Sequence, residues 1–371
     1  MKMKSIFGIL VAATCFLASC TKNSGTGDSD SLFGSYDQES MLNNIGSNAL
    51  LPGIQHFAAS AAAANTAIAS FTASPDAASL TAAQNAWVQL ALDWATAASF
   101  DFGPMNDQLL SAQIDTWPVN TTKIENAVNT QADAATQGSD AKGLKALEYL
   151  LFDKNGNQQV LGKYTGDDEA ATNRKKYLAS VAQNLVTISS TLQNAWSGDG
   201  KYLSTFTSAK GNNVSSSVSL LVNTISLYLD VVKNMKIGNP IGMGVKINDN
   251  QPHPDMIEYT LAEQSLPAMK ANVQSMKAAF DGGNGQGLDD LLDYVKAQKD
   301  GQNLSAVINS TFDDVIAKID AVTPPYATAV SGQTQQLKDI YNSLKLLIAY
   351  FKVDVANNLG VTITFSDTDG D

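Results

Sequence analysis

Charged residues and histidines are scarce in this sequence, and each shortage excludes some functions. Of the 371 residues only 16% are charged, and acidic residues outnumber basic ones by 36 to 24, for a net charge of −12. Phosphate binding needs a positive face, so we exclude nucleic acid as a partner and expect no electrostatic docking on anionic lipid. The two histidines, His56 and His253, are too far apart for a metallopeptidase motif. We expect both to be structural or exposed, and any metal site to depend on carboxylates.

Only two cysteines occur, and both lie at the N-terminus. The basic residues Lys2 and Lys4 precede an apolar run over residues 6–17, which is too short to span a bilayer and ends in the lipobox Leu-Ala-Ser-Cys20. A buried helix is the alternative interpretation of this run. We predict a signal peptide over 1–19 and a lipid anchor at Cys20, which places the protein in the cell envelope, on the outer membrane. Cleavage removes Cys15 and acylation occupies Cys20, so no thiol remains for a disulfide, a zinc site or a nucleophile.

The rest of the chain is dominated by helical periodicity. Residues 20–36 are rich in Ser, Gly and Asp and predict a lipidated tether. Beyond them apolar residues recur every three or four positions, as at Leu178, Val181, Leu185, Ile188, Leu192 and Trp196. The Ala-rich stretch 44–71 favours a helix, with Pro52 in its first turns or at a kink. Only 361–365 resembles a strand. We therefore predict an all-α fold of roughly eight to eleven helices.

Glycine-rich segments divide this helical body. The segment 197–213 ends one long helix and precedes another, so we predict an N-terminal bundle over 37–200 and a C-terminal bundle over 201–371. The segment 238–244 predicts a loop on a domain face, and 282–287 an interhelix turn. Asp367–Asp371 lacks the length and the glutamate of a calcium loop, so we interpret it as an acidic tail.

One helical segment combines charge with an apolar setting. Gly143, Lys145 and Glu148 precede Leu150, Leu151 and Phe152, and Asp140 is a plausible N-cap for this helix. At spacing i and i+3, Lys145 and Glu148 share one face. They are either an exposed ion pair of little energetic weight or a pair within an apolar cleft.

This segment resembles the G-x-H-x-x-E signature of the imelysin family. Further segments agree with the family in order: Ser99–Pro104, Trp117-Pro118, Gly238–Gly242, Ile257-Glu258 and Leu359–Phe365. The resemblance covers roughly residues 40–371. It implies two α-helical bundles with the motif near their interface, and a metal at the motif that serves either metallopeptidase activity or iron binding in uptake.

The chain departs from that signature at Lys145, which stands where the family has histidine. An ammonium group has no lone pair to offer a metal. We therefore predict a non-enzymatic binding protein without catalytic residues, in which Gly143, Lys145 and Glu148 bind an anionic or zwitterionic ligand between the bundles. The resemblance to the family implies a link to iron uptake.

Other readings of the same residues stay open. The alternative function is a metallopeptidase that holds iron or another divalent metal, with Glu148 as the one ligand that the motif still offers. A scaffold that binds no ligand is a third interpretation. The partner is an unknown small ligand or an envelope protein. Asp93, Asp101 and Glu258 are further acidic candidates, but their spacing does not show whether any of them converge.

Overall fold

The computed structural model describes residues 30–365, and it confirms the all-α prediction. The predicted signal peptide, Cys20, most of the predicted tether and the acidic segment 367–371 lie outside the described residues. Within 30–365 the only strands are β1 (Gln298–Lys299) and β2 (Gln302–Asn303), which pair in a short antiparallel hairpin. No helix in this range is long and apolar enough to cross a membrane.

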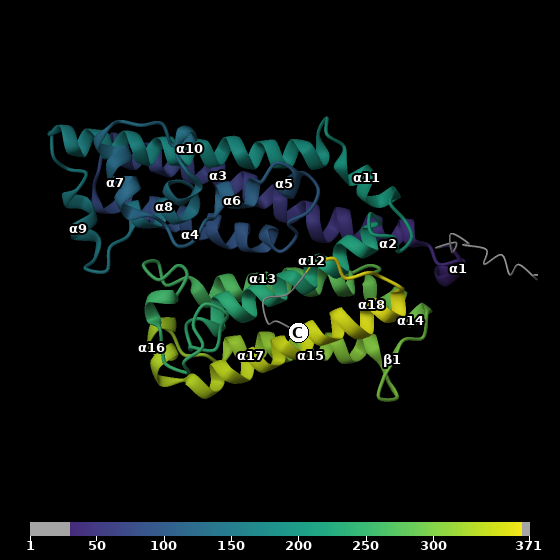
Figure 1. The fold of residues 1–371 in the computed structure, drawn as a ribbon. Helices are drawn as coiled ribbons and strands as arrows, with labels where there is room; N and C mark the ends of the chain where they lie inside the picture. The colour runs from purple at the N-terminus through teal and green to yellow at the C-terminus, as the bar shows by residue number, and fades with distance from the viewer. Residues whose placement is uncertain (1–29, 366–371) are drawn as a thin grey trace, which may run out of the picture.

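The helices form two layers, which Figure 1 shows one above the other. The upper layer is built on three long helices packed against one another: α3 (Leu51–Ala73), α4 (Ala77–Ala98) and α10 (Glu169–Ser197). Shorter helices cover them: α5 (Pro104–Asp107), α6 (Leu110–Ile114), α7 (Thr121–Asn129), α8 (Gly143–Leu151) and α9 (Asn157–Gly162).

The lower layer contains the C-terminal half of the chain. Its long helices are α12 (Ser217–Val231), α13 (Ser265–Asp281), α15 (Leu304–Asp320) and α17 (Thr334–Ala349). Two of them continue as π-helices, α12 into η4 (Val232–Gly238) and α17 into η6 (Tyr350–Val355) followed by α18 (Ala356–Leu359). Two short helices complete the layer, α14 (Leu288–Tyr294) and α16 (Tyr326–Gly332). The segment 282–287 turns between α13 and α14, as predicted.

The sequence gives these helices clear starts and one buried face. Asp168 caps α10 by accepting a hydrogen bond from the Ala171 N–H, and the apolar stripe predicted in this helix is buried. Asp76 and Ser79 form a reciprocal capping box at the start of α4. Such caps satisfy backbone N–H groups that have no partner within the helix.

The layers meet mainly along α4 and α13. There the Asn272 side chain donates to the Ala95 carbonyl oxygen at 2.6 Å, and the Ser275 hydroxyl donates to that of Ser99 at 2.9 Å. Buried apolar residues from both layers belong to one continuous core. Burial of that core on both sides stabilises the layers against separation.

The Ala-rich segment is part of a longer helical run than predicted. Helix α2 (Gln38–Asn44) passes through the π-helix η1 (Ile45–Leu50) into α3, and Pro52 lies in the first turn of α3. The wider π turn ends at Leu50, two residues before the proline, which has no N–H to donate. At the end of α2, the Asn44 side chain donates to the carbonyl oxygens of Gly282 and Gln286 in the lower layer, at 2.9 and 2.8 Å.

Several details differ from the sequence predictions. Residues 30–36, assigned to the tether, contribute helix α1 (Asp30–Phe33) and the fully buried Phe33. Tyr36 adds a ring contact with Tyr294, with the centroids 5.2 Å apart. Residues 361–365 form no strand; Asn223 instead bonds the backbone of Thr362 and Thr364. The segment 238–244 is largely buried rather than on a face.

The number of helices also differs from the prediction. There are more helical segments than eight to eleven, because helices of four to nine residues are too short to show a period. Helix α10 ends at Ser197, and α11 (Tyr202–Ser208) contacts α2 and α10 before the chain enters the lower layer at α12. The division into bundles at 197–213 stays a prediction.

Candidate functional site

Helix α8 carries the motif, and its first residue must be glycine. Gly143 has φ of 78°, a backbone conformation that residues with side chains rarely adopt, and a Cβ there would overlap the carbonyl oxygen of Ile114. Asp140 is not the N-cap that was predicted. It lies in the 3-10 turn η3 (Ser139–Ala141) and pairs with Lys123 at 2.8 Å, while Lys142 precedes the helix without capping it. Gly143 therefore permits a close approach of α8 to α6.

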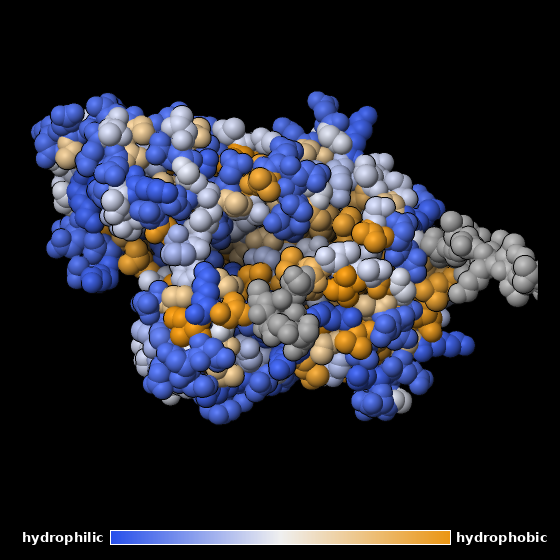
Figure 2. Space-filling view, in the orientation of Figure 1, coloured by the Kyte–Doolittle hydropathy of each residue, from blue (hydrophilic) through white to orange (hydrophobic). Residues whose placement is uncertain are grey.

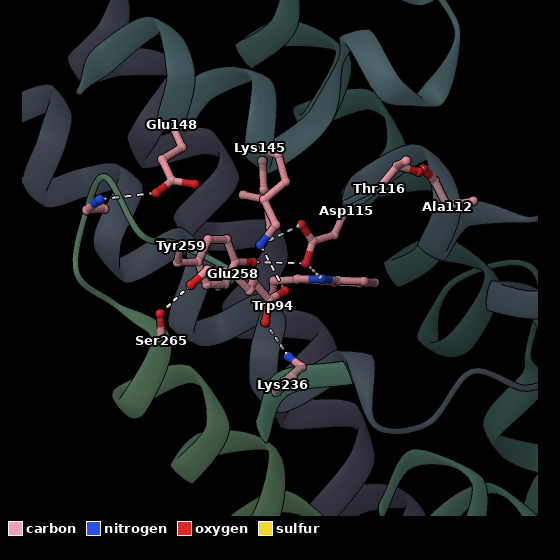
Figure 3. A network of polar contacts seen from close by, with 12 residues as sticks. Trp94, Ala112, Asp115, Thr116, Lys145, Glu148, Lys236, Glu258, Tyr259 and Ser265 are labelled. Atoms are coloured by element: carbon pink, nitrogen blue, oxygen red, sulfur yellow. Dashed lines mark hydrogen bonds and ion pairs between the residues drawn. The ribbon is translucent and has the colours of Figure 1, made fainter. Parts of the chain in front are cut away.

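Lys145 lies inside the protein rather than in an open cleft. Its side chain is 2% exposed, and its ammonium is 2.8 Å from Glu258 Oε1 and 3.3 Å from Asp115 Oδ1. The ammonium also lies over the Tyr259 ring, 2.8 Å from its centroid (Figure 3). The exposed pairing with Glu148 that we considered is not formed. The partners of Lys145 are distant in sequence, and they enclose its charge on three sides.

Glu148 faces a backbone segment instead. Its Oε1 accepts hydrogen bonds from the N–H groups of Leu261 and Ala262, at 2.9 and 3.1 Å, so α8 is joined to the chain that leads into α13. Burial raises the pKa of this carboxyl group, and nearby Lys145 opposes the rise. The motif glutamate therefore helps to fix the position of the segment that carries Glu258 and Tyr259.

Glu258 joins the two layers electrostatically. Its second oxygen, Oε2, is 2.8 Å from the ammonium of Lys236, which projects from η4 in the lower layer and also donates to the Asn272 side chain at 2.9 Å. Burial alone would raise the pKa of Glu258, but Lys145 and Lys236 lower it to about 2. The carboxylate is thus held ionised between two ammonium groups.

Asp115 and Tyr259 complete the arrangement. The Asp115 Oδ2 atom accepts hydrogen bonds from Trp94 Nε1 at 3.0 Å and from the Tyr259 hydroxyl at 2.9 Å. Burial raises the pKa of Asp115, against the lowering influence of Lys145. Tyr259 is 2% exposed and has φ of 51°, a strained conformation for a residue with a side chain. We call Asp115, Lys145, Lys236, Glu258 and Tyr259 the seam cluster.

A pocket of about 310 Å³ opens beside the seam cluster. Its lining comes from both layers and includes three members of the cluster. The lining residues are Trp94, Ala98, Asp101, Ser111, Ala112, Asp115, Trp117, Tyr228, Val231, Met235, Lys236 and Glu258. In Figure 2 hydrophilic residues cover much of the outer face of both layers, while hydrophobic residues gather near the seam on the face shown. A small molecule could bind at this pocket between the layers.

A metal does not fit the motif as this chain builds it. The ammonium of Lys145 lies between the carboxylates of Asp115 and Glu258 and supplies the positive charge there. Within residues 30–365 no group of three or more His, Cys, Asp or Glu side chains is placed to hold a metal ion. With Lys145 and Lys236 facing Asp115 and Glu258, two positive charges balance two negative ones. A divalent cation would have to displace Lys145.

The other candidate residues fall in different places. Asp101 lines the pocket, but Asp93 accepts a hydrogen bond from Gln89 one turn earlier in α4 and is not among the lining residues. His56 is exposed on α3, and His253 contacts Asp249 at 2.9 Å. The structure thus brings Lys145 and Glu258 into contact and leaves both histidines outside the site.

Sequence reasoning missed Asp115, Lys236 and Tyr259. Their neighbours gave the available signal, since Trp117-Pro118 follows Asp115 by two residues, Gly238 follows Lys236 by two, and Tyr259 directly follows Glu258. Those neighbours contributed to the family resemblance, but nothing in their spacing showed that they meet.

Comparison with known proteins gives consistent results. The Imelysin family model matches residues 50–349. Iron-regulated protein A of Synechococcus elongatus is 24% identical over 232 residues, and the match spans 60% of this chain and 58% of that protein.

Two crystal structures share the fold. One is of a candidate iron-regulated protein A precursor from Parabacteroides distasonis, with a TM-score of 0.72 at 20% identity over 87% of this chain and 95% of that one. The other is of an imelysin-like protein from Psychrobacter arcticum, with a TM-score of 0.68 at 15% identity over 89% and 97%. At these identities the likeness shows the fold alone.

Fold and site together define a class of protein. It is an all-α, two-layer protein with a charged cluster and a small pocket at the seam between its layers. Within that class, the family match over residues 50–349 is decisive: the chain belongs to the imelysin family. It is a member whose signature has Lys145 in place of histidine.

Proposed function

We propose that this protein is a non-enzymatic ligand-binding protein of the cell envelope, with its binding site at the seam between the layers. The observation that supports this most is the position of Lys145, 2.8 Å from Glu258 and 3.3 Å from Asp115. In this cluster the lysine itself neutralises the carboxylates that a cation would need. No free nucleophile or metal-activated water is required for the proposed role.

The ligand would occupy the pocket beside the cluster rather than contact Lys145. The Lys145 side chain is almost fully buried and does not line the pocket. It therefore fixes the positions of Asp115 and Glu258 from the side that faces away from the pocket. Gly143 and Glu148 act in the same indirect way, through the position of α8 and of the segment before α13. We thus replace the direct contacts expected from the motif with a positioning role.

The envelope location rests on the N-terminus of the sequence. We propose that Cys20 is acylated and that the lipid holds the protein at the outer membrane, since the acidic body would be repelled by anionic lipid. Cys20→Ser should move the protein from the membrane fraction to the soluble fraction. Unchanged membrane association of that variant would contradict the proposal.

A link to iron is the last part of the proposal. Iron-regulated protein A of Synechococcus elongatus is 24% identical over the matched part, and its name describes regulation by iron. We propose that this protein too is produced in response to iron supply. Quantitative proteomics of cells grown with and without an iron chelator would test this, and equal abundance in the two cultures would contradict it.

Titration calorimetry with Fe²⁺ and Zn²⁺ tests the absence of metal chemistry. The wild-type protein should bind neither metal more tightly than about micromolar, or roughly −8 kcal/mol. Lys145→His restores the family signature and should raise the affinity modestly, because it adds a neutral nitrogen donor beside Asp115 and Glu258. Tight metal binding by the wild type, or chelator-sensitive peptide cleavage, would favour the metallopeptidase alternative.

A further inference from the structure

The pocket contains one acidic group that the seam cluster does not neutralise. Asp101 follows helix α4, and among the described residues it forms no ion pair with any lysine, arginine or histidine. Its Oδ2 atom accepts a hydrogen bond from the Ser111 hydroxyl at 2.7 Å. Its Oδ1 atom is shielded from water and has no hydrogen-bond donor. Asp101 as a whole is half-buried at the wall of the pocket, and a carboxylate without a cationic partner there favours a positively charged ligand.

Aromatic rings line the same pocket. Trp94, Trp117 and Tyr228 contribute to its wall, together with the polarisable side chain of Met235. The faces of such rings attract positive charge, and tryptophan does so most strongly. A carboxylate beside aromatic rings is an arrangement that suits an organic cation.

The ammonium groups near the pocket are either paired with carboxylates or exposed to water. Lys236 lines the pocket but lies 2.8 Å from Glu258, and Lys145 lies behind the wall between Asp115 and Glu258. Lys246 lies 5.9 Å from the Trp117 ring centroid, but its side chain is exposed, where water screens its charge. The lining is therefore acidic overall, and an anionic ligand would find the nearby ammonium groups either paired, as at Lys145 and Lys236, or screened by water, as at Lys246.

We propose that this pocket binds a small organic ammonium compound, with its positive charge at Asp101 and its apolar body against the aromatic rings. The pocket volume of about 310 Å³ lies at the lower end of small-molecule sites, which span roughly 300–1,000 Å³. This inference rests on the proposed binding function and gives it a ligand class. It also replaces the anionic or zwitterionic ligand expected from Lys145.

Three probes of matched shape and different charge test the ligand class. Phenethylamine is cationic, phenylalanine is zwitterionic, and 3-phenylpropionate is anionic, while all three contain the same phenyl group. In titration calorimetry with the mature wild-type protein, phenethylamine should bind most tightly and 3-phenylpropionate at least about tenfold more weakly. Stronger binding of the anion, or no binding of any probe, would overturn the proposal.

Variants locate the charge that recognises the amine. Asp101→Asn keeps the shape of the side chain and should weaken phenethylamine binding at least about tenfold. Asp107→Asn, on the exposed surface of α5, removes the same charge outside the pocket and should leave the affinity unchanged. Ser111→Ala removes the hydrogen bond to Asp101 but keeps its charge, so it should weaken phenethylamine binding less than Asp101→Asn does. Equal affinities in wild type and Asp101→Asn would overturn the role of Asp101.

Two further measurements distinguish a variant that fails to fold from a wrong assignment of the ligand class. Asp101→Asn should fold normally, because it removes a half-buried charge that has no ionic partner, and its Tm should be no lower than that of the wild type. Ala112→Trp fills the pocket and should abolish binding of every probe. If 3-phenylpropionate binds best and Ala112→Trp blocks it, the ammonium class is wrong while the pocket remains a binding site. The metal titrations test the proposed function separately.

Discussion

Two buried lysines in this protein form ion pairs of opposite kinds. Lys233 is 1% exposed and pairs with Asp230, three residues earlier in the same helical run, at 3.2 Å. Lys145 is 2% exposed, but it pairs with Glu258, which is 113 positions away in the sequence and bonded to the lower layer through Lys236. The first ion pair lies within one helical run, and Lys233 also lies over the Tyr341 ring of α17, 5.6 Å from its centroid. The second determines how two layers fit together.

The comparison shows why burial alone does not assign a role to a lysine. A buried pair within one helix can form whenever that helix forms, since its partners share one face. The seam cluster forms only when α8, η4 and the segment around Glu258 have reached their places. We therefore expect changes at the seam cluster to affect the arrangement of the layers and the pocket between them, and changes at Lys233 to act within the lower layer.

The largest expected effect comes from replacing each lysine with methionine. Lys145→Met leaves Asp115 and Glu258 short of one positive charge and should lower the free energy of unfolding by about 3–5 kcal/mol. Lys233→Met should cost less, about 1–3 kcal/mol, because Asp230 also accepts a hydrogen bond from the Asn234 side chain. Urea denaturation measures both. A greater loss in Lys233→Met would contradict the distinction between the two pairs.

Acid should weaken the seam cluster in a defined pH window. The pKa of Glu258 is lowered from 4.5 to about 2, so its contribution is present above about pH 4.5 and is lost as the pH falls toward 2. That contribution is roughly 3 kcal/mol. The stability difference between wild type and Glu258→Gln should therefore shrink across this window, as followed by denaturation at each pH. A difference that stays constant would contradict the ionised state assigned to Glu258.

Asp289, at the start of α14 and away from the seam, provides a control, because its pKa is raised whereas that of Glu258 is lowered. Burial raises its pKa from 3.8 to about 6, so its favourable contribution is present below pH 3.8 and is lost as the pH rises through 6. As the pH rises from 3.8 through 6, the Asp289→Asn variant should therefore gain stability relative to the wild type. The same denaturation series measures this change, and an identical pH profile for both variants would show that neither reports on its own site.

A smaller effect is expected from the backbone that positions Lys145. Gly143 and Gly156 both have positive φ, but only at Gly143 would a Cβ overlap the backbone of another helix. Gly156→Ala should cost about 1–2 kcal/mol through backbone strain alone. Gly143→Ala should cost about 3 kcal/mol, since overlap adds to the strain. Equal losses of Tm in the two variants would show that α8 does not need its close approach to α6.

The smallest effect should come from an ion pair outside the core. Lys123 and Asp140 lie 2.8 Å apart, but the lysine side chain is 56% exposed. Lys123→Met should change the free energy of unfolding by less than about 0.5 kcal/mol, because water screens the pair. A loss comparable to that of Lys145→Met would mean that ion pairing as such, rather than burial at the seam, accounts for the effect.

The sequence predicted the helices well where they are long. The stripe from Leu178 to Trp196 lies on the buried face of α10, because a helix exposes the same face every three or four residues. Phe33 and residues 361–365 were misassigned, since their roles depend on tertiary contacts that no local pattern reveals.

The candidate site was predictable only in part. Lys145 and Glu148 were found from their own helix, and Glu258 and Asp101 were named as acidic candidates. Their partners could not be found, because contacts between Lys145 and Glu258 or between Asp115 and Tyr259 join segments more than a hundred residues apart. Such contacts follow from how helices pack, which periodicity does not specify.

The long span of these contacts also bears on how the protein folds. Closing a chain over 113 residues loses more conformational entropy than closing a helical turn, and contacts of this kind form slowly. We expect the helices and their neighbours within each layer to form first, while Lys145 still has water around its charge. Its dehydration between Asp115 and Glu258 would then be among the final steps. The seam cluster would form only after both layers have folded, so it would stabilise only chains in which both layers are correctly folded.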